Sequence, residues 1–248
     1  MTTTRFLAVA TGLLVLAGCG DSGGGDDRGS ATSAPRPATS KPAVEKDPAS
    51  AIKVLESKLI YLPDQAGGNF YVAFVRVRNT SKEVAINVGG QLSVKSPTGQ
   101  LVKSVNPTEI NVLPGQEGLI DEEAVDLPTV VKNAKLDFRL TVEDFRAGPA
   151  VSPVSFSKTA YSKDEFGGCK ISGTVSNTFS EKKDDLQLRV AGFFEGKLVT
   201  GGFTYVDTVF PKQDATFEVS ISGAAACPKR VDRIGVYPNL GDDKIFNP

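Results

Sequence analysis

The chain has 248 residues, with 28 Lys and Arg, 29 Asp and Glu, no histidine and no tryptophan. The lack of histidine excludes a Ser-His-Asp triad, a Cys-His pair, a histidine metal ligand and an imidazole pH switch. A net charge near zero argues against binding to a phosphate backbone, which requires clustered lysine and arginine. The sequence therefore predicts no nucleic-acid partner, and no motif in it points to a cofactor.

Residues 1–18 have the pattern of a signal peptide. Arg5 precedes an apolar run over residues 6–17, which is too short to span a bilayer and has the length of a signal-peptide core. The run ends in Leu16-Ala17-Gly18-Cys19, which resembles a bacterial lipobox. The resemblance implies a diacylglyceryl thioether on Cys19, whose two acyl chains would hold the protein stably on the extracytoplasmic side of the cell membrane. A plain secretory signal with a free Cys19 is the alternative.

Residues 19–50 are predicted to form a disordered linker. The stretch 20–50 contains no aromatic residue and is rich in Gly, Ser, Pro, Ala and Asp. Such a segment buries too little apolar surface to offset the entropy of the chain. As a flexible coil it would span on the order of 30 Å, so we interpret it as a spacer between the membrane and a folded part. The alternative is that the segment has no function, since the same composition fits that interpretation.

Residues 51–248 contain an internal repeat. The motif Ser-Lys-x-x-Tyr-x-x-Asp-x-x-Gly-Gly occurs at residues 57–68 and again at residues 157–168. Further along, Val77-x-Asn79-Thr80 recurs as Val175-x-Asn177-Thr178, and Pro114-x-Gln116 recurs as Pro211-x-Gln213. Because the order is kept, the pattern indicates a duplication. It predicts two domains, residues 51–148 and 149–248, each of the usual size of a small all-β domain.

Both halves alternate apolar and polar residues as half-buried strands do. Examples are residues 75–78, 170–172, 186–190 and 216–221. Turn signals separate such segments: Gly67-Gly68, Pro97-Thr-Gly99, Leu113-Pro-Gly115, Glu195-Gly196 and Gly201-Gly202. The segments 52–59 and 151–156 are also predicted strands, although Asp47-Pro48 could begin a helix over the first of them.

The second half carries a family resemblance. Its segment 171–177 (Ile-Ser-Gly-Thr-Val-Ser-Asn), its Gly-Lys-Leu-Val turn at 196–199 and its Thr-Phe-Glu-Val strand at 216–219 resemble the telokin-like and FxLYD-type Ig-like domains of bacterial lipoproteins. The first half is similar through Val75-Arg-Val77-Arg-Asn79 and Leu113-Pro-Gly115, although neither half contains a literal F-x-L-Y-D string. The resemblance implies an all-β protein of two tandem Ig-like antiparallel β-sandwich domains outside the cytoplasm. It implies no activity.

Two cysteines, Cys169 and Cys227, remain once Cys19 is lipidated. Outside the cytoplasm two such cysteines usually oxidise together. A reactive or metal-binding pair is less consistent with the sequence, because the chain has no histidine ligand and no C-x-x-C motif. We therefore predict a structural disulfide in the second half only.

Acidic residues form two kinds of candidate site. The cluster Asp121-Glu122-Glu123 with Asp126 would offer oxygen ligands to Ca²⁺, but a charged edge strand that prevents aggregation explains it better. Asp184-Asp185 and Asp242-Asp243 are interpreted as solvated turns. The repeated pairs Tyr61 with Asp64 and Tyr161 with Asp164 would mark equivalent ligand sites, or else a packed tyrosine followed by a turn.

The segment Phe70-Tyr-Val-Ala-Phe74 is apolar at every position after Asn69. If Tyr71 and Ala73 face inward, then Phe70, Val72 and Phe74 face outward as an apolar stripe. Such a stripe would cover a domain interface, a partner site or a lipid-binding groove. A strand buried on both faces is the alternative.

Taken together, these patterns predict a membrane-anchored lipoprotein with a non-catalytic interaction or structural role in the cell envelope, with an envelope or extracellular protein as partner. The alternative is a carrier of a small apolar ligand or lipid. A carboxylate-dependent hydrolase is less favoured, since acid-base chemistry would fall to carboxylates, lysines or tyrosines alone.

Overall fold

The computed structural model describes residues 48–62, 69–127, 131–163, 165, 167–221 and 227–241. The predicted signal peptide, Cys19 and the linker up to residue 47 lie outside the described residues. The same holds for Asp64, Gly67-Gly68, Asp164 and Asp242-Asp243. No helix in the described ranges is long and apolar enough to cross a membrane.

The described part of the chain is built from β-strands after a single 3-10 turn, η1 (Pro48–Ala51). The first half holds β1 (Ile52–Leu62), β2 (Asn69–Asn79), β3 (Val84–Lys95), β4 (Leu101–Val105), β5 (Ile110–Val112), β6 (Glu117–Leu127), β7 (Lys135–Thr141) and β8 (Asp144–Arg146). The second half holds β9 (Val154–Lys163), β10 (Cys169–Asn177), β11 (Lys183–Phe194), β12 (Lys197–Val209), β13 (Asp214–Ile221) and β14 (Arg233–Asn239). The all-β prediction is confirmed, and the segment 52–59 is strand rather than helix.

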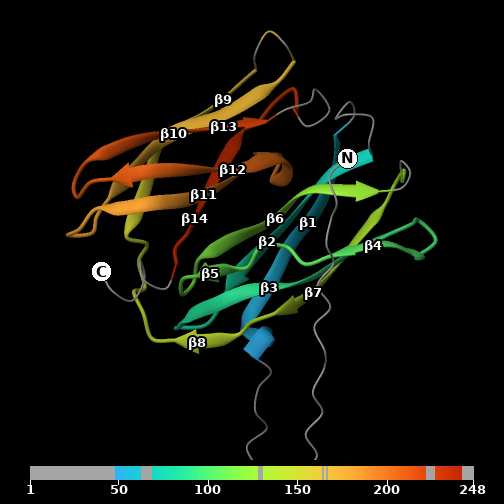
Figure 1. The fold of residues 1–248 in the computed structure, drawn as a ribbon, viewed down its shortest axis with the longest axis horizontal. Helices are drawn as coiled ribbons and strands as arrows, with labels where there is room; N and C mark the ends of the chain where they lie inside the picture. Colours follow the sequence, from blue (N-terminus) through green and yellow to red (C-terminus); the bar gives the residue numbers. More distant parts are fainter. Residues whose placement is uncertain are drawn as a thin grey trace, which may run out of the picture. The chain divides into compact units, whose positions relative to one another are not determined.

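Each half is a sandwich of antiparallel sheets (Figure 1). In the first half the sheet β1-β2-β6 packs against a second sheet, in which β4, β5, β7 and β8 all pair with β3. In the second half the sheet β9-β10-β13 packs against β12-β11-β14. Inward-facing residues alternate along each strand, as in Val75 and Val77 of β2 and Leu186, Leu188 and Val190 of β11.

The predicted disulfide is present in the second half. Cys169 at the start of β10 is bonded to Cys227 in the segment before β14, with their Cα atoms 5.6 Å apart. Both cysteines are buried. The bond therefore ties the end of one sheet of the second sandwich to the segment that leads into the other sheet.

The repeated Asn-Thr motif makes the same hydrogen bonds in both halves. The side-chain amide of Asn79 donates to the carbonyl oxygen of Val112 at 2.8 Å, and that of Asn177 donates to Val209 at 2.9 Å. Each amide also donates to the carbonyl four residues ahead, at 2.7 Å and 2.8 Å, and each side-chain oxygen accepts from the backbone N–H two residues ahead, at 2.9 Å and 2.8 Å. These buried asparagines therefore close equivalent corners, as a duplicated sequence would require.

Most predicted turns that fall in the described ranges are turns. Residues 97–99, 114–115 and 195–196 connect strands, and Glu195 and Gly196 have positive φ angles of 51° and 74°, as a tight hairpin requires. The prediction for Gly201-Gly202 is wrong, because both residues lie inside β12. A Cβ on Gly201 would lie 2.6 Å from the carbonyl oxygen of Val190 and 3.0 Å from the ring of Phe74. The glycine is there to allow close packing between the two halves.

Candidate functional site

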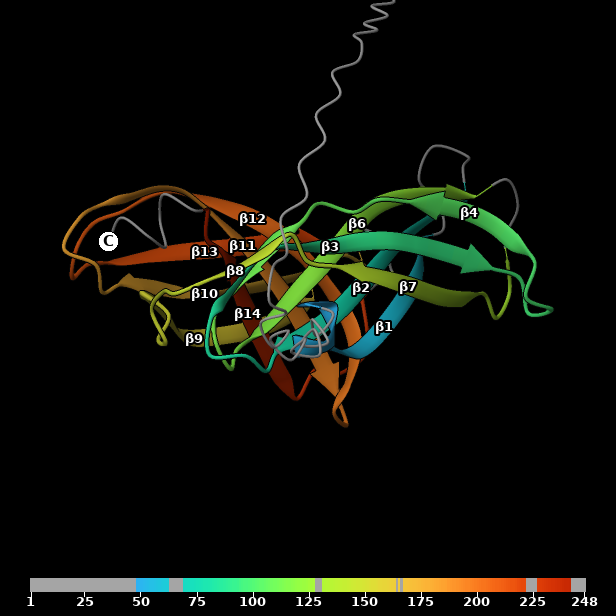
Figure 2. The same cartoon turned by 90° about the horizontal axis from the view of Figure 1, so that it is seen from below.

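The two sandwiches contact each other through the outer faces of β1-β2-β6 and β12-β11-β14, and also where the side-chain amide of Asn111 on β5 donates to the carbonyl oxygen of Leu240 at 2.9 Å. Strands β11 and β14 lie beside β6 in both views (Figures 1 and 2). Ile60, Phe74 and Leu119 of the first half belong to the same buried cluster as the core of the second half. All described strands accordingly fall in one compact unit, Glu45–Pro248.

The predicted apolar stripe lies largely in this interface. Phe74 is 1% exposed, and its ring lies against Gly201 of β12. Val72 is half-buried and packs against the second-half cluster, while Phe70 is half-buried at the start of β2. The stripe thus covers a domain interface, one of the alternatives left open by the sequence. The prediction that Phe74 belongs to a free binding surface for a separate partner is wrong, because the second half already covers that side chain.

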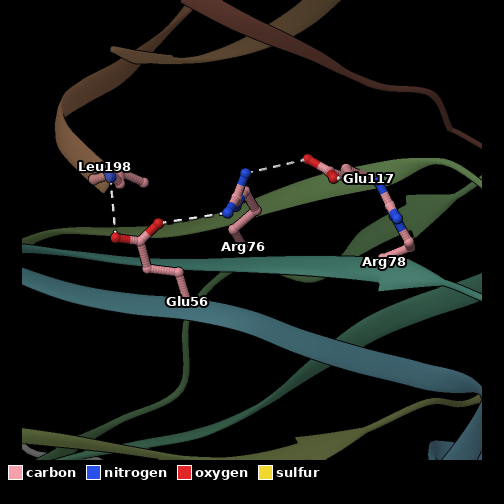
Figure 3. Close-up of polar contacts among 5 residues, drawn as sticks. All are labelled: Glu56, Arg76, Arg78, Glu117 and Leu198. Carbon is pink, nitrogen blue, oxygen red and sulfur yellow. Dashed lines mark hydrogen bonds and ion pairs between the residues drawn. The ribbon is translucent and has the colours of Figure 1, made fainter. Parts of the chain in front are cut away.

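A row of charged side chains, here called the charged seam, follows the same face. It comprises Glu56, Arg76, Arg78 and Glu117, with Asp121 and Arg189 at one end. Arg76 lies between two acids, with a guanidinium nitrogen 3.6 Å from a carboxylate oxygen of Glu56 and another 3.6 Å from one of Glu117. Arg78 pairs with Glu117 at 2.7 Å (Figure 3). These are cross-strand pairs, since Glu56 lies opposite Arg76 and Arg78 lies opposite Glu117 in the register.

The charged seam also reaches the second half. The backbone N–H of Leu198 on β12 donates to Oε1 of Glu56 at 3.0 Å (Figure 3). The guanidinium of Arg76 lies 4.9 Å from the ring centroid of Phe193 on β11, and that of Arg233 on β14 lies 3.8 Å from the same centroid. Because the ring of Phe193 is fully buried and the side chain of Arg76 is only 15% exposed, we expect the contact with Arg76 to be stronger than an exposed one, whereas Arg233 is exposed.

The fold places the residues of the acidic cluster in different surroundings. Strand β6 is the edge of its sheet, as predicted, but Asp121 points into the interface and forms an ion pair and hydrogen bond with Nε of Arg189. The two side chains are only 5% and 3% exposed. The interpretation of Asp121 as a solvent-facing edge charge is therefore wrong, because the second sandwich brings a guanidinium to it.

The neighbours of Asp121 do not join it in a metal site in the described part of the chain. There, no group of three or more Cys, Asp or Glu side chains is placed to hold a metal ion, and the side chain of Glu123 lies outside the described residues. Asp126 is exposed. Burial raises the pKa of the Glu122 carboxyl above its usual range, and the charge of Asp121 raises it further. Calcium binding at this cluster thus gains no geometric support.

Burial also governs the polar groups that complete the interface. Burial raises the pKa of the Tyr237 hydroxyl, the charge of Glu117 adds to that effect, and Arg76 and Arg233 oppose it. Within the described residues, Nε of Arg76 and Nη1 of Arg189 are buried without a hydrogen-bond partner. The acids of the charged seam are paired with guanidinium groups from neighbouring strands and from the second half.

The repeated tyrosines have packing roles. The ring of Tyr61 lies 5.0 Å from that of Tyr71, centroid to centroid, and the hydroxyl of Tyr161 donates to the carbonyl oxygen of Pro228 at 2.6 Å. Asp184 and Asp185 lie within β11 rather than in a turn, and Asp184 pairs with Lys182 at 2.7 Å. The ligand-site alternative for the two tyrosines therefore gains no support.

The arginines of the interface were not among the residues predicted from the sequence. Arg189 is the second polar residue of the alternating segment 186–190 (Leu-Gln-Leu-Arg-Val) and directly precedes a run, Val190 to Phe194, that contains no polar side chain. A charged residue directly before such a run in a strand is a signal for a buried partner, because an unpaired buried charge is very costly. That signal was available, although the identity of the partner was not.

Comparison with known proteins adds no family assignment. No protein-family model matches the chain, and no curated protein matches it.

Proposed function

We propose that this protein is a membrane-anchored extracytoplasmic lipoprotein that acts as a non-catalytic interaction or structural module of the cell envelope. The observation that carries the proposal is the apolar run that ends in Leu16-Ala17-Gly18-Cys19 and is followed by the Gly-, Ser- and Pro-rich linker. The Cys169–Cys227 disulfide supports an extracytoplasmic location, because such bonds persist in oxidising compartments.

The pairing of the buried and half-buried acids with arginines supports a non-catalytic role. Glu56, Glu117 and Asp121 are each paired with an arginine across strands or across the interface. A general acid or base must instead be free to exchange a proton with a bound substrate. The chain has no histidine to take that part.

The interface between the two sandwiches supports the proposal that they act together as one module. Ion pairs, cation–π contacts and the buried ring of Phe74 join the sandwiches over the outer face of β1-β2-β6. On a linker that spans on the order of 30 Å as a coil, the two sandwiches would move together above the membrane. Partner binding would then involve surfaces other than this interface.

The anchor is tested by the mass of the mature protein. The full chain, expressed in a bacterium that processes lipoproteins and extracted from its membranes, is expected to begin at Cys19 and to carry the added mass of a diacylglyceryl group. Cys19→Ser should move the protein out of the membrane fraction, whereas Ser22→Ala in the linker should leave it there. A mature chain that begins at another residue, with Cys19 absent or carrying a free thiol, would contradict the proposal.

A further inference from the structure

The outer face of β9-β10-β13 is lined by small hydroxyl side chains. In the register Ser157 of β9 lies opposite Thr174 of β10, which lies opposite Thr216 of β13. The neighbouring rows on the same face add Ser155, Ser162, Ser172, Ser176 and Ser220. Because alternate residues of a strand share a face, these hydroxyls form an array over three adjacent strands.

A hollow of about 410 Å³ opens in this array. It is lined by Lys158, Ser172, Gly173, Thr174, Thr216, Phe217 and Glu218. Strand β9 bulges beside it, since the register shifts between Ser172 and Thr174, and Lys158 has a positive φ of 51°. Bulges of this kind often lie next to binding sites, where they redirect a side chain.

The glycine at the floor of the hollow is required by packing. A Cβ on Gly173 would lie 2.7 Å from the ring of Phe217, which lies opposite Gly173 on β13. Because Gly173 and Phe217 alternate with the outward residues of their strands, this contact lies on the core side of the sheet, and the bulge of β9 is the feature that interrupts the outer face. The volume falls within the range of small-molecule pockets, roughly 300–1,000 Å³.

The chemistry of the hollow selects a neutral, polar ligand. Lys158 and Glu218, which both line the hollow, have opposite charges, and Glu218 is paired with Lys170 at 2.9 Å. The charges therefore do not favour an ion of either sign. Hydroxyl groups can both donate and accept hydrogen bonds, and a carboxylate accepts them strongly.

The same face is poorly suited to a protein or a lipid. Its outward rows carry no aromatic side chain, and Phe217, which also lines the hollow, is only 4% exposed, whereas the centres of protein interfaces are enriched in aromatic residues, methionine and arginine. An apolar ligand would leave the hydroxyls of Thr174 and Thr216 without water, which is costly. A ligand with many hydroxyl groups would instead replace that water.

We propose that this hollow is a binding site for a neutral saccharide. The sugar hydroxyls would donate to the carboxylate of Glu218 and exchange hydrogen bonds with Ser172, Thr174 and Thr216. The ammonium of Lys158 would donate to a ring or hydroxyl oxygen. This inference depends on the described residues of the second half and does not require the lipid anchor.

Saturation-transfer NMR on the full chain in detergent tests the proposal, with maltose, lactose, mannobiose and N,N′-diacetylchitobiose as probes. At least one probe should receive saturation from the protein. Thr216→Val removes one exposed hydroxyl and should weaken binding about threefold to tenfold, as expected for one neutral hydrogen bond. Glu218→Gln removes the charged acceptor and should weaken binding by about tenfold or more.

The matched control is Thr141→Val, the same change at an exposed position on β7 of the first half. It should leave binding unchanged. The inference is overturned if none of the four probes binds, or if binding is the same in Thr216→Val and Glu218→Gln as in the unaltered chain. It is also overturned if sedimentation shows that Thr216→Tyr abolishes self-association, because the face would then bind a second copy of the chain.

Discussion

The sheets β1-β2-β6 and β9-β10-β13 come from equivalent parts of the repeat, yet the outer face of the first is buried and that of the second is open to solvent. Phe74 and Arg76 stand five and three residues before Asn79, and at the same distances before Asn177 stand Ser172 and Thr174. The first pair is covered by the second sandwich, while the second pair lines an open hollow. One framework of strands therefore supports either a docking face or an open hydroxyl face, depending on a few outward residues.

The acids on the last strand of each sheet show the same contrast. Asp121 of β6 and Glu218 of β13 both stand seven residues after a repeated proline, Pro114 and Pro211. Asp121 is buried against Arg189, whereas Glu218 is half exposed and pairs with Lys170 on its own sheet. An equivalent carboxylate thus joins two sandwiches in one case and stays on the surface in the other.

The largest expected effect comes from removing the aromatic ring of the docking face. Phe74→Ala should lower the free energy of unfolding by about 5 kcal/mol, at the upper end for a core phenylalanine, because the ring fills space between both halves. The equivalent change Ser172→Ala should alter it by less than about 0.5 kcal/mol. Urea denaturation followed by circular dichroism measures both. Equal losses in the two variants would refute the comparison.

Loss of the disulfide should come next. The bond joins cysteines 58 residues apart, and a loop of that length stabilises by about 4 kcal/mol in the chain-entropy model. Cys169→Ala with Cys227→Ala should therefore lower the melting temperature markedly, and a reducing agent should do the same to the unaltered chain. If the reducing agent leaves the melting temperature unchanged, the bond contributes no stability to the second sandwich.

Breaking the buried ion pair should cost about 3 kcal/mol. Asp121→Ala leaves the guanidinium of Arg189 buried without its carboxylate, whereas Glu218→Ala removes an exposed partner and should cost less than about 1 kcal/mol. The double change Asp121→Leu with Arg189→Met should recover most of the loss, since well-packed apolar groups replace buried pairs at little cost. Denaturation midpoints of these three variants and of the unaltered chain measure the effect. A double variant as unstable as Asp121→Ala would show that packing, not charge, explains the single loss.

The smallest effect concerns a feature that the halves share. Asn79→Ala and Asn177→Ala should each lower stability by about 2 kcal/mol, because each leaves buried backbone groups unsatisfied. The two losses should agree closely, unlike those at Phe74 and Ser172. A difference above about 1 kcal/mol would indicate that the two corners are not equivalent.

The sequence was sufficient to predict what depends on local pattern. Alternation predicted the strands and placed Phe74 on the outward face of β2, the Asn-Thr motif revealed the duplication, and the compartment predicted the Cys169–Cys227 bond. These features depend on neighbours in the chain or on an argument about compartment.

What the sequence could not supply was the long-range geometry of the interface. Arg189 and Asp121 are 68 residues apart, and the local sequence around either residue does not predict that the two form a pair. Gly201-Gly202 has the composition of a turn, yet both residues lie within a strand. Gly201 is required there because the ring of Phe74 from the other half leaves no room for a side chain. The hollow likewise depends on the register of three strands, which periodicity alone does not fix.

The central claim is that the two sandwiches are joined through the outer face of β1-β2-β6 into one body. Spin-labelled unnatural amino acids at Thr141 and Ser220, exposed positions in different halves, would report the distance between the halves by pulsed electron resonance on the full chain. We expect one narrow distance distribution, which broadens in Phe74→Ala. A broad distribution in the unaltered chain, as from two sandwiches on a flexible connection, would contradict the account.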